Sequence, residues 1–247
     1  FNVTALQNRG LKAIVKLGDC SAAFVSDTGL LLGNYSCIAK NITAAAQQQG
    51  VSLQNGYTAL RRSAELQLPH LTAALITDTQ NVTVQINRQL PAGLSSTERA
   101  EKIKQLSHAL EQECQQLSQQ RCEVASSFDG LEYQLITSNI LTDLRLVHLP
   151  AATASNKADN WHWPRYQADY VLLRAYQTPT MPRADSTPRE AEAYQPKAHL
   201  RLSAAGVQEG EAVVAAAFPR SSQRYSTAAQ LQFLFKHYYP QAVLYRQ

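Results

Sequence analysis

The sequence predicts a mainly β fold, a barrel with amphipathic helices inserted into it. Short apolar runs recur along the chain with turn residues between them, as in antiparallel strands. One stretch with helical periodicity, about 95–120, interrupts the strands. Helical segments are too few to alternate with the strands, as a parallel α/β sheet requires. With 247 residues and 45% hydrophobic content, the chain can bury a substantial core.

The N-terminal part predicts strands followed by a short helix. Between Leu11 and Leu32, three apolar runs are separated by turn residues, and Asp27-Thr28-Gly29 is typical of a hairpin link. After them, Asn41 is expected to cap an alanine-rich helix that Gly50 ends.

The next segment is expected to form a second hairpin. "TAALITD" and "NVTVQINRQL" are interpreted as paired strands around a turn at 78–80. The reason is that Val82, Val84 and Ile86 alternate with polar residues.

Residues 96–119 are predicted to form a long amphipathic helix. Ser95 and Glu98 have the spacing of a capping box. Apolar side chains then recur at steps of three and four residues, at Ile103, Leu106, Leu110, Cys114 and Leu117. This stripe requires an apolar surface to cover.

Strand signals return in the C-terminal half of the chain. The predicted strands are "LEYQLI", "LRLVHL", "DYVLLRAY", "HLRLS" and "AVVAAAF". The proline-rich segment 177–198 is interpreted as a surface loop. A last helix is expected from Ser226 and is predicted to end at Pro240.

Composition narrows the class of protein. The net charge of +4 comes from dispersed charges without a basic run, which disfavours nucleic-acid binding. No apolar run reaches the roughly 18 residues of a membrane span. The first residues, beginning at Phe1, look like a mature end left after removal of a signal peptide.

The four cysteines form two sequence-local pairs, Cys20 with Cys37 and Cys114 with Cys122. We favour two disulfides, and hence a periplasmic or secreted location. Buried thiols and metal ligation are the alternatives, although neither pair has C-x-x-C spacing.

Several segments together resemble the bacterial dipeptidyl-peptidases of types seven and eleven. They are the cysteine-bracketed hairpin at 20–37, "DLRLVHLP" at 143–150, "DNWHWPRYQADYVLLRAY" at 159–176, and the segment 194–233. The resemblance covers essentially the whole chain, and the cysteine pairs fall in the family's order. It implies a trypsin-like double barrel interrupted by a helical domain. Residues 1–247 would then be the first barrel with a helical insertion at about 95–120, without the second barrel and the helical cap.

The resemblance also assigns catalytic positions. Ser36 stands where the family presents its general base histidine, and a hydroxyl does not titrate near neutral pH. Asp169 matches the aspartate that orients the base, so it is a vestigial catalytic residue or a structural one. No Gly-x-Ser-Gly turn, typical of the family's nucleophile, occurs in the chain.

Other candidate residues are less specific. Asn160 and Trp161 match residues that hold the substrate's N-terminus in the family, but they could equally belong to the core. The sequence predicts neither a cofactor nor a metal site, because no metal-ligand spacing occurs. No histidine has a sequence reason to approach Asp169 except His162; the others are His70, His108, His148, His199 and His237.

The leading hypothesis is a catalytically inactive dipeptidyl-peptidase-like protein that serves as a peptide- or protein-binding scaffold. A protein partner or second fragment is expected to cover the face left by the second barrel. One alternative is part of an active serine dipeptidyl-peptidase whose nucleophile and base lie on another chain. A second is a carbohydrate- or peptide-binding module without an ancestral site.

Overall fold

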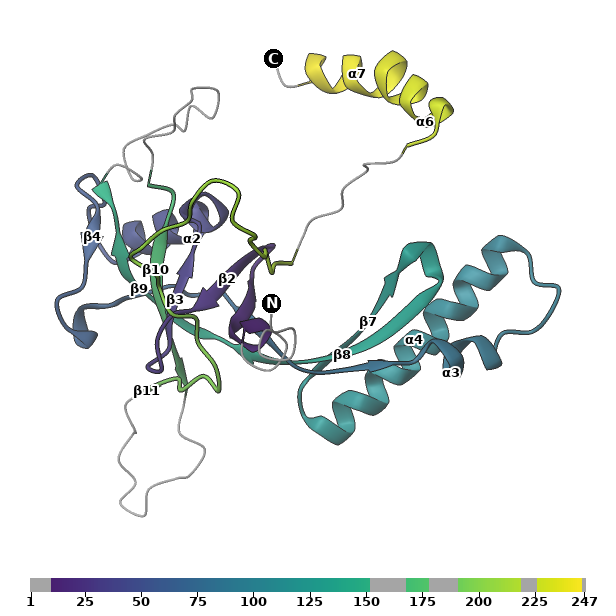
Figure 1. Ribbon diagram of the computed structural model, residues 1–247, viewed down its shortest axis with the longest axis horizontal. Coiled ribbons are helices and arrows are strands. Elements are labelled where there is room, and N and C mark those ends of the chain that lie inside the picture. Colours follow the sequence, from purple (N-terminus) through teal and green to yellow (C-terminus); the bar gives the residue numbers. More distant parts are fainter. Residues whose placement is uncertain (1–9, 152–167, 178–190, 219–225, 246–247) are drawn as a thin grey trace.

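The computed structural model describes residues 10–151, 168–177, 191–218 and 226–245 (Figure 1). In this part of the chain, eleven strands form one antiparallel sheet with the order β4-β9-β10-β3-β2-β1-β6-β8-β7, while β11 and β5 pair beside it. The strands are β1 Ile14–Leu17, β2 Cys20–Phe24, β3 Leu30–Gly33, β4 Tyr57–Thr58, β5 Leu66–Gln67, β6 Ala73–Asn81, β7 Arg121–Ser127, β8 Glu132–Leu141, β9 Asp143–Leu149, β10 Val171–Gln177 and β11 Glu192–Ala193. The predicted mainly β class is therefore confirmed.

The helices are few. They are α2 Tyr35–Gln48, α3 Thr83–Arg88, α4 Ser96–Ser118, α6 Ala228–Phe233 and α7 Tyr239–Leu244, with a π-helical turn Leu234–Tyr238 and short 3-10 turns Leu11–Ala13, Arg62–Ala64 and Phe128–Gly130.

Most strands form a barrel-like unit, which we call the barrel: β1 to β5, β9 and β10 with the near ends of β6 and β8 (Figure 1). Its core contains apolar side chains from every one of these strands except β4, and α2 covers it through Ile38 and Ile42. Phe24 and Leu173 are completely buried in this core. Along β2 and β10, buried residues alternate with half-buried ones, which places these side chains inside.

The hairpin predicted at 27–29 is present between β2 and β3. Gly29 has a φ of +73°, which only glycine adopts readily, and a Cβ there would lie 2.7 Å from the Tyr194 carbonyl oxygen. The turn therefore requires glycine both for its conformation and for its close contact with the backbone.

Strands β6 and β8 continue beyond the barrel into a second unit, which we call the lobe: the far ends of β6 and β8 with β7, α3 and α4 (Figure 1). Its core has three buried side chains, Val82, Ile86 and Tyr133. The apolar stripe of α4 packs against them, but none of the 23 residues of α4 is itself buried. The helix predicted at 96–119 and its Ser95–Glu98 capping box are both present.

A buried ion pair braces the barrel. Glu65 is 8% exposed and accepts hydrogen bonds from Arg174 Nε at 2.8 Å and from Tyr176 Oη at 2.7 Å. Arg145 stacks over the Tyr176 ring at 4.0 Å. These contacts join the segment before β5 to β9 and β10, so the carboxylate is paired rather than isolated in the core.

Several sequence-based boundaries were wrong. The predicted turn at 78–80 is not present, because β6 continues through these residues. The strand predicted after that turn is instead the helix α3, Thr83–Arg88. Val82 and Ile86 are four residues apart, so one helical turn brings both to the same face, against Tyr133. Helix α2 also begins earlier than predicted, at Tyr35, so that Asn41 lies within it.

The C-terminal predictions also need correction. Residues 199–203 and 212–218 form no strand; Leu202 is 72% and Val213 73% exposed, and no described strand pairs with them. Pro240 does not end the last helix, because it occupies the second position of α7, where a missing amide proton costs no hydrogen bond within that helix. Of the predicted loop 177–198, residues 178–190 lie outside the described residues.

Candidate functional site

The sheet brings Ser36 and Asp169 together, although 133 residues separate them. Asp169 lies just before β10, whose first residue Val171 pairs with Gly33 at the end of β3. Directly after β3 the chain enters α2, whose first turn contains Ser36. The antiparallel register of β3 and β10 therefore places the carboxylate beside the helix N-terminus.

Three hydrogen bonds reach the Asp169 carboxylate. The Ser36 backbone N–H donates to Oδ1 at 2.8 Å, and the Ser36 hydroxyl donates to Oδ2 at 2.6 Å. The Asn34 side-chain amide donates to Oδ2 at 3.4 Å. Both carboxylate oxygens are thus occupied by donors from the start of α2.

This arrangement has the form of a helix cap. Asn34 is the N-cap residue of α2, but its side chain makes no capping hydrogen bond. Asp169 supplies the acceptor instead, from a distant part of the chain, and its negative charge lies at the positive end of the helix dipole. The geometry gives Asp169 a structural role that needs no chemistry at Ser36.

Ser36 and Asp169 can do little proton transfer by themselves. The Ser36 hydroxyl donates its proton to the carboxylate and carries no group that accepts a proton near neutral pH. A general base at this place requires an imidazole or a comparable side chain. Among the described residues, the site therefore holds a carboxylate and a hydroxyl, and no imidazole is bonded to them.

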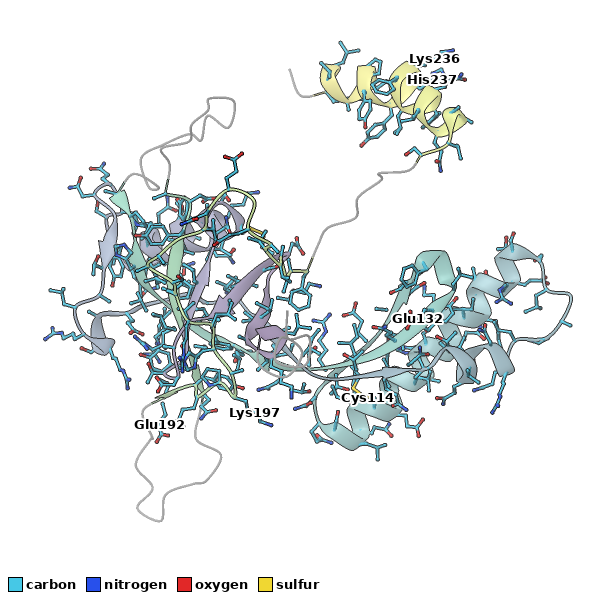
Figure 2. The ribbon with its side chains drawn as sticks, in the orientation of Figure 1. Cys114, Glu132, Glu192, Lys197, Lys236 and His237 are labelled. Atoms are coloured by element: carbon cyan, nitrogen blue, oxygen red, sulfur yellow. A yellow bond between two sulfur atoms is a disulfide. The ribbon has the colours of Figure 1, made fainter. Side chains whose placement is uncertain are left out.

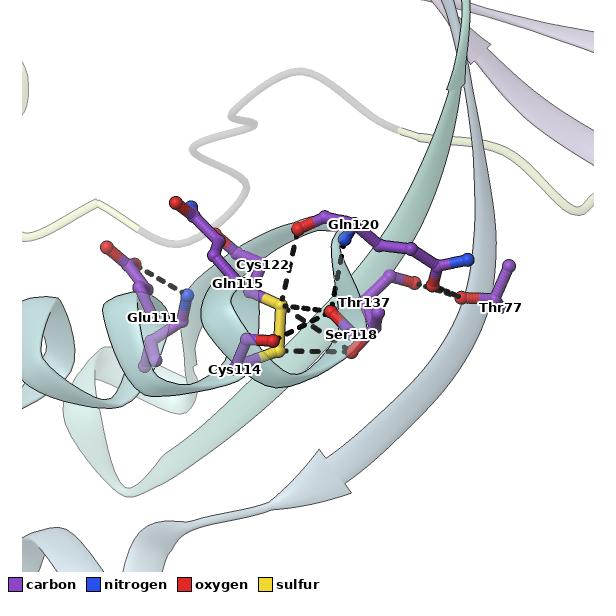
Figure 3. The surroundings of a disulfide bond; sticks show 9 residues. Thr77, Glu111, Cys114, Gln115, Ser118, Gln120, Cys122 and Thr137 are labelled. Atoms are coloured by element: carbon purple, nitrogen blue, oxygen red, sulfur yellow. Dashed lines mark hydrogen bonds between the residues drawn. A yellow bond between two sulfur atoms is a disulfide. The ribbon is translucent and has the colours of Figure 1, made fainter. Parts of the chain in front are cut away.

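The Cys20–Cys37 disulfide fixes the start of α2 from the other side. It joins β2 to the residue after Ser36, with Cα atoms 6.1 Å apart. Together with Asp169 it holds the first turn of α2 against the barrel. The second predicted disulfide, Cys114–Cys122, is also present and lies in the lobe (Figures 2 and 3).

A cavity of about 550 Å³ lies beside Asp169. Asn34 and Asp169 line it together with mostly apolar residues of the barrel strands and of the segment after β11, among them Ile14, Ala23, Leu32 and Val214. That segment crosses the barrel, because Phe218 N–H donates to the Ser21 hydroxyl at 2.7 Å and Leu200 N–H to the Phe24 carbonyl. The cavity is mainly hydrophobic, with the carboxylate and the carboxamide among its few polar groups.

No histidine in the described part of the chain forms a hydrogen bond with Asp169. His148 contacts Thr58 through Nδ1 at 2.8 Å and Tyr170 through Nε2 at 3.3 Å. His108 contacts Glu111 and Gln112 on α4. His162, which the sequence placed nearest to Asp169, lies outside the described residues.

Other predictions have different outcomes. Asn160 and Trp161 lie outside the described residues, so their proposed role stays a prediction. Sequence reasoning missed Asn34 as a partner of Asp169, and no local signal points to it, because the two residues meet only through the pairing of β3 and β10. Within the described ranges, no cluster of three metal-ligating side chains occurs, and no helix is long and apolar enough to cross a membrane.

The family model for Peptidase S46 matches residues 2–247. The chain belongs to the Peptidase S46 family. Among its relatives, the Asp/Glu-specific dipeptidyl-peptidase of Shewanella putrefaciens is 32% identical over 239 residues, which cover 93% of this chain and 32% of that enzyme. Dipeptidyl-peptidase 7 of Porphyromonas endodontalis is 27% identical over 218 residues, which cover 85% of this chain and 26% of that protein.

Solved structures of the Peptidase S46 relatives share the fold. The crystal structure of Porphyromonas endodontalis DPP11 in complex with the dipeptide Arg-Glu has a TM-score of 0.62 and 25% sequence identity to this chain. The match covers 81% of this chain and 31% of that one. This chain therefore spans about a third of the length of the relatives that it matches.

Proposed function

We propose that this chain is a catalytically inactive dipeptidyl-peptidase-like protein, which serves as a peptide- or protein-binding scaffold or as a subunit of a complex. The single observation that carries the proposal is the Ser36 hydroxyl bound to Asp169. A serine peptidase needs a base that accepts the proton of its nucleophile, and an aspartate that orients this base. Here the aspartate is retained, but its partner is a hydroxyl.

The retained aspartate does not argue for activity. Asp169 accepts the Ser36 backbone N–H and caps α2, so folding of the barrel alone accounts for its presence. The retained aspartate is therefore compatible with an inactive chain.

A binding role is supported by the apolar surface of the barrel. The cavity beside Asp169 has the size of a small-ligand site. The segment that crosses the barrel exposes large apolar side chains, including Leu202, Val207 and Val213. An exposed apolar surface of this kind favours a partner, which we propose to be a protein or a second fragment of the same precursor.

The proposed location is the periplasm or the cell surface. Two disulfides close short loops of the chain, and such bridges persist in oxidising compartments. Mass spectrometry of non-reduced protein from separated cell fractions tests this location: both bridges should be intact in the exported fraction.

Activity-based labelling tests the loss of catalysis. The native protein, with every polypeptide that co-purifies with it, is treated with a fluorophosphonate probe and with fluorogenic dipeptidyl substrates. We expect no covalent labelling and no release of dipeptides, while the Shewanella putrefaciens relative serves as the positive control. Labelling of any polypeptide in the assembly would instead support the second candidate, an active dipeptidyl-peptidase whose nucleophile and base lie on another chain.

A substitution tests whether the base position still has its geometry. In Ser36→His, the introduced imidazole would lie beside the Asp169 carboxylate, so its pKa should rise above the ordinary value of about 6.5. Nuclear magnetic resonance measures this titration, and the control is the same substitution combined with Asp169→Asn. An unchanged imidazole pKa in both variants would show that position 36 does not correspond to a base position.

Binding is tested at Trp161. Peptide affinity of the wild-type protein and of Trp161→Ala is measured by calorimetry, with circular dichroism as the folding control. Loss of binding with an intact fold supports a retained peptide groove, whereas unchanged binding places the binding surface elsewhere.

A further inference from the structure

Helix α4 is attached to the lobe weakly for its length. None of its residues is fully buried, and the lobe core that it covers has three buried side chains. Leu117, in its last turn, is 80% exposed. In the C-terminal half of α4, Leu110 packs against this core, and other contacts must hold the turns that follow it.

A disulfide and two hydrogen bonds to the β7 backbone join this half of α4 to β7, beside a contact of 3.6 Å between Ser118 Oγ and Cys122 Sγ (Figure 3). The Cys114–Cys122 disulfide links the helix to the strand covalently. The Glu111 carboxylate accepts the Val124 backbone N–H at 2.8 Å, and the Gln115 side chain donates to the Cys122 carbonyl at 3.3 Å. The two backbone hydrogen bonds are single, half-buried contacts, so the disulfide is the strong one.

The two hydrogen bonds also occupy the free edge of the sheet. Strand β7 is the last in the sheet order, and its other side pairs with β8. The Val124 N–H and the Cys122 carbonyl belong to the side without a neighbouring strand, and α4 satisfies both. A sheet edge with unpaired backbone groups is a template for another strand. Helix α4 thus protects β7 from pairing.

The disulfide can be approached from a cavity. A space of about 370 Å³ lies between α4 and the sheet, and Cys114, Ser118 and Thr137 are among the residues that line it. Cys122 is only 4% exposed, whereas Cys114 is half-buried. A small thiol that enters this space reaches the sulfur of Cys114 first.

We propose that the Cys114–Cys122 disulfide is a redox-sensitive latch, whose reduction by a dithiol releases the C-terminal half of α4 and frees the edge of β7. A thiolate of the dithiol attacks Cys114 Sγ, and the sulfur of Cys122 leaves as a thiolate and takes up a proton. The second thiolate of the reagent then attacks the reagent's first sulfur in the mixed disulfide. Cys114 leaves as a thiolate and takes up a proton. Two cysteine thiols form, and the reagent is oxidised to its cyclic disulfide.

Hydrogen exchange of the full chain tests the latch. Oxidised protein is titrated with dithiothreitol, and alkylation with mass spectrometry reports which bridge is open. Once Cys114–Cys122 is open, we expect exchange of the β7 amides, Val124 above all, to accelerate by at least about tenfold, as in local opening. Amides of β2 and β10 should stay protected.

Variants separate the two bridges. Cys114→Ser/Cys122→Ser should show fast exchange at β7 without reductant, and dithiothreitol should add nothing there. In Cys20→Ser/Cys37→Ser the only remaining bridge is that of the lobe, so reductant should still open β7. If either variant fails to fold, the titration of the wild-type protein decides alone. Unchanged β7 protection after verified cleavage, or resistance of Cys114–Cys122 to the dithiol under native conditions, would overturn the proposal.

Discussion

The barrel and the lobe share strands β6 and β8, yet different interactions stabilise each of them internally. The barrel core is one cluster of twenty-one buried residues, and Glu65 and Arg174 brace it from within. The core cluster of the lobe has three buried residues, and the lobe depends more on a capped helix and a disulfide. A continuous sheet therefore does not imply uniform stability: the barrel is stabilised by burial, and the lobe by individual contacts.

The largest effect is expected in the barrel core. Phe24 is completely buried, so Phe24→Ala should lower the free energy of unfolding by about 3–5 kcal/mol. Because its cluster spans the whole barrel, the loss should appear as a lower midpoint of global unfolding in urea. Leu60→Ala is the control, since Leu60 is 94% exposed and its truncation should have almost no effect. A local loss of structure without a change of the global midpoint would contradict the comparison.

A comparable truncation in the lobe should act locally. Ile86 is completely buried, and Ile86→Ala should cost about 2–4 kcal/mol. We expect faster hydrogen exchange in α3, α4 and β7, with little change in β2 and β10. Val84→Ala is the matched control on the same helix, because Val84 is 61% exposed. Equal loss of protection in both units would show that they unfold as one.

Alkaline pH should weaken the barrel through Tyr176. Burial, and then the hydrogen bond to Glu65, raise the pKa of Tyr176 from 10.0 to about 12. The folded protein thus keeps this proton to higher pH than the unfolded chain. This contribution of Tyr176 to the free energy of unfolding is complete below pH 10 and is lost as pH rises towards 12; with solvent screening it amounts to at most about 2 kcal/mol. Urea unfolding of wild type and Tyr176→Phe across this range measures it; equal slopes would contradict the assignment.

The smallest effect is expected at the first turn of α4. The Ser95 hydroxyl accepts the Glu98 N–H in the capping box, so Ser95→Ala should destabilise the helix by about 1 kcal/mol. Faster exchange confined to α4 is the expected result, and Thr97→Ala is the neighbouring control. The hydrogen bonds with Ser95 also lower the pKa of Glu98. The stabilisation that comes from the Glu98 charge is therefore present above the ordinary Glu pKa, and it is lost as pH falls through the lowered pKa of the folded protein. A cap effect that spreads into the barrel would contradict the separation of the two units.

Local signals made part of the fold predictable from the sequence. The capping box and the regular stripe of α4 lie within one segment, so its bounds were predicted to within a residue. The turn of the β2–β3 hairpin with Gly29 was likewise predicted from a local signal, although β2 begins two residues before the predicted apolar run. Alternation misled at Val82, Val84 and Ile86, because a short apolar pattern fits a strand and a helical turn equally well, and the Tyr133 contact decides between them.

The candidate site depended on tertiary contacts that the sequence does not display. The resemblance to the family pointed to Ser36 and Asp169, but not to the capping of α2 by Asp169, since the two positions meet only through the pairing of β3 and β10. The start of α2 was misplaced for the same reason: its acceptor comes from another part of the chain. Segments 199–203 and 212–218 have strand-like composition, but each makes only a single backbone N–H contact with β2, through Leu200 and Phe218, and neither forms a ladder with a described strand.

The Asp169 hydrogen bond to the Ser36 amide has a consequence for how relatives of this chain are sorted. Because this bond caps α2, an aspartate at position 169 is expected wherever the barrel folds, and its presence alone is no evidence of peptidase activity. Under the proposed assignment, the side chain opposite, at position 36, is the one to compare.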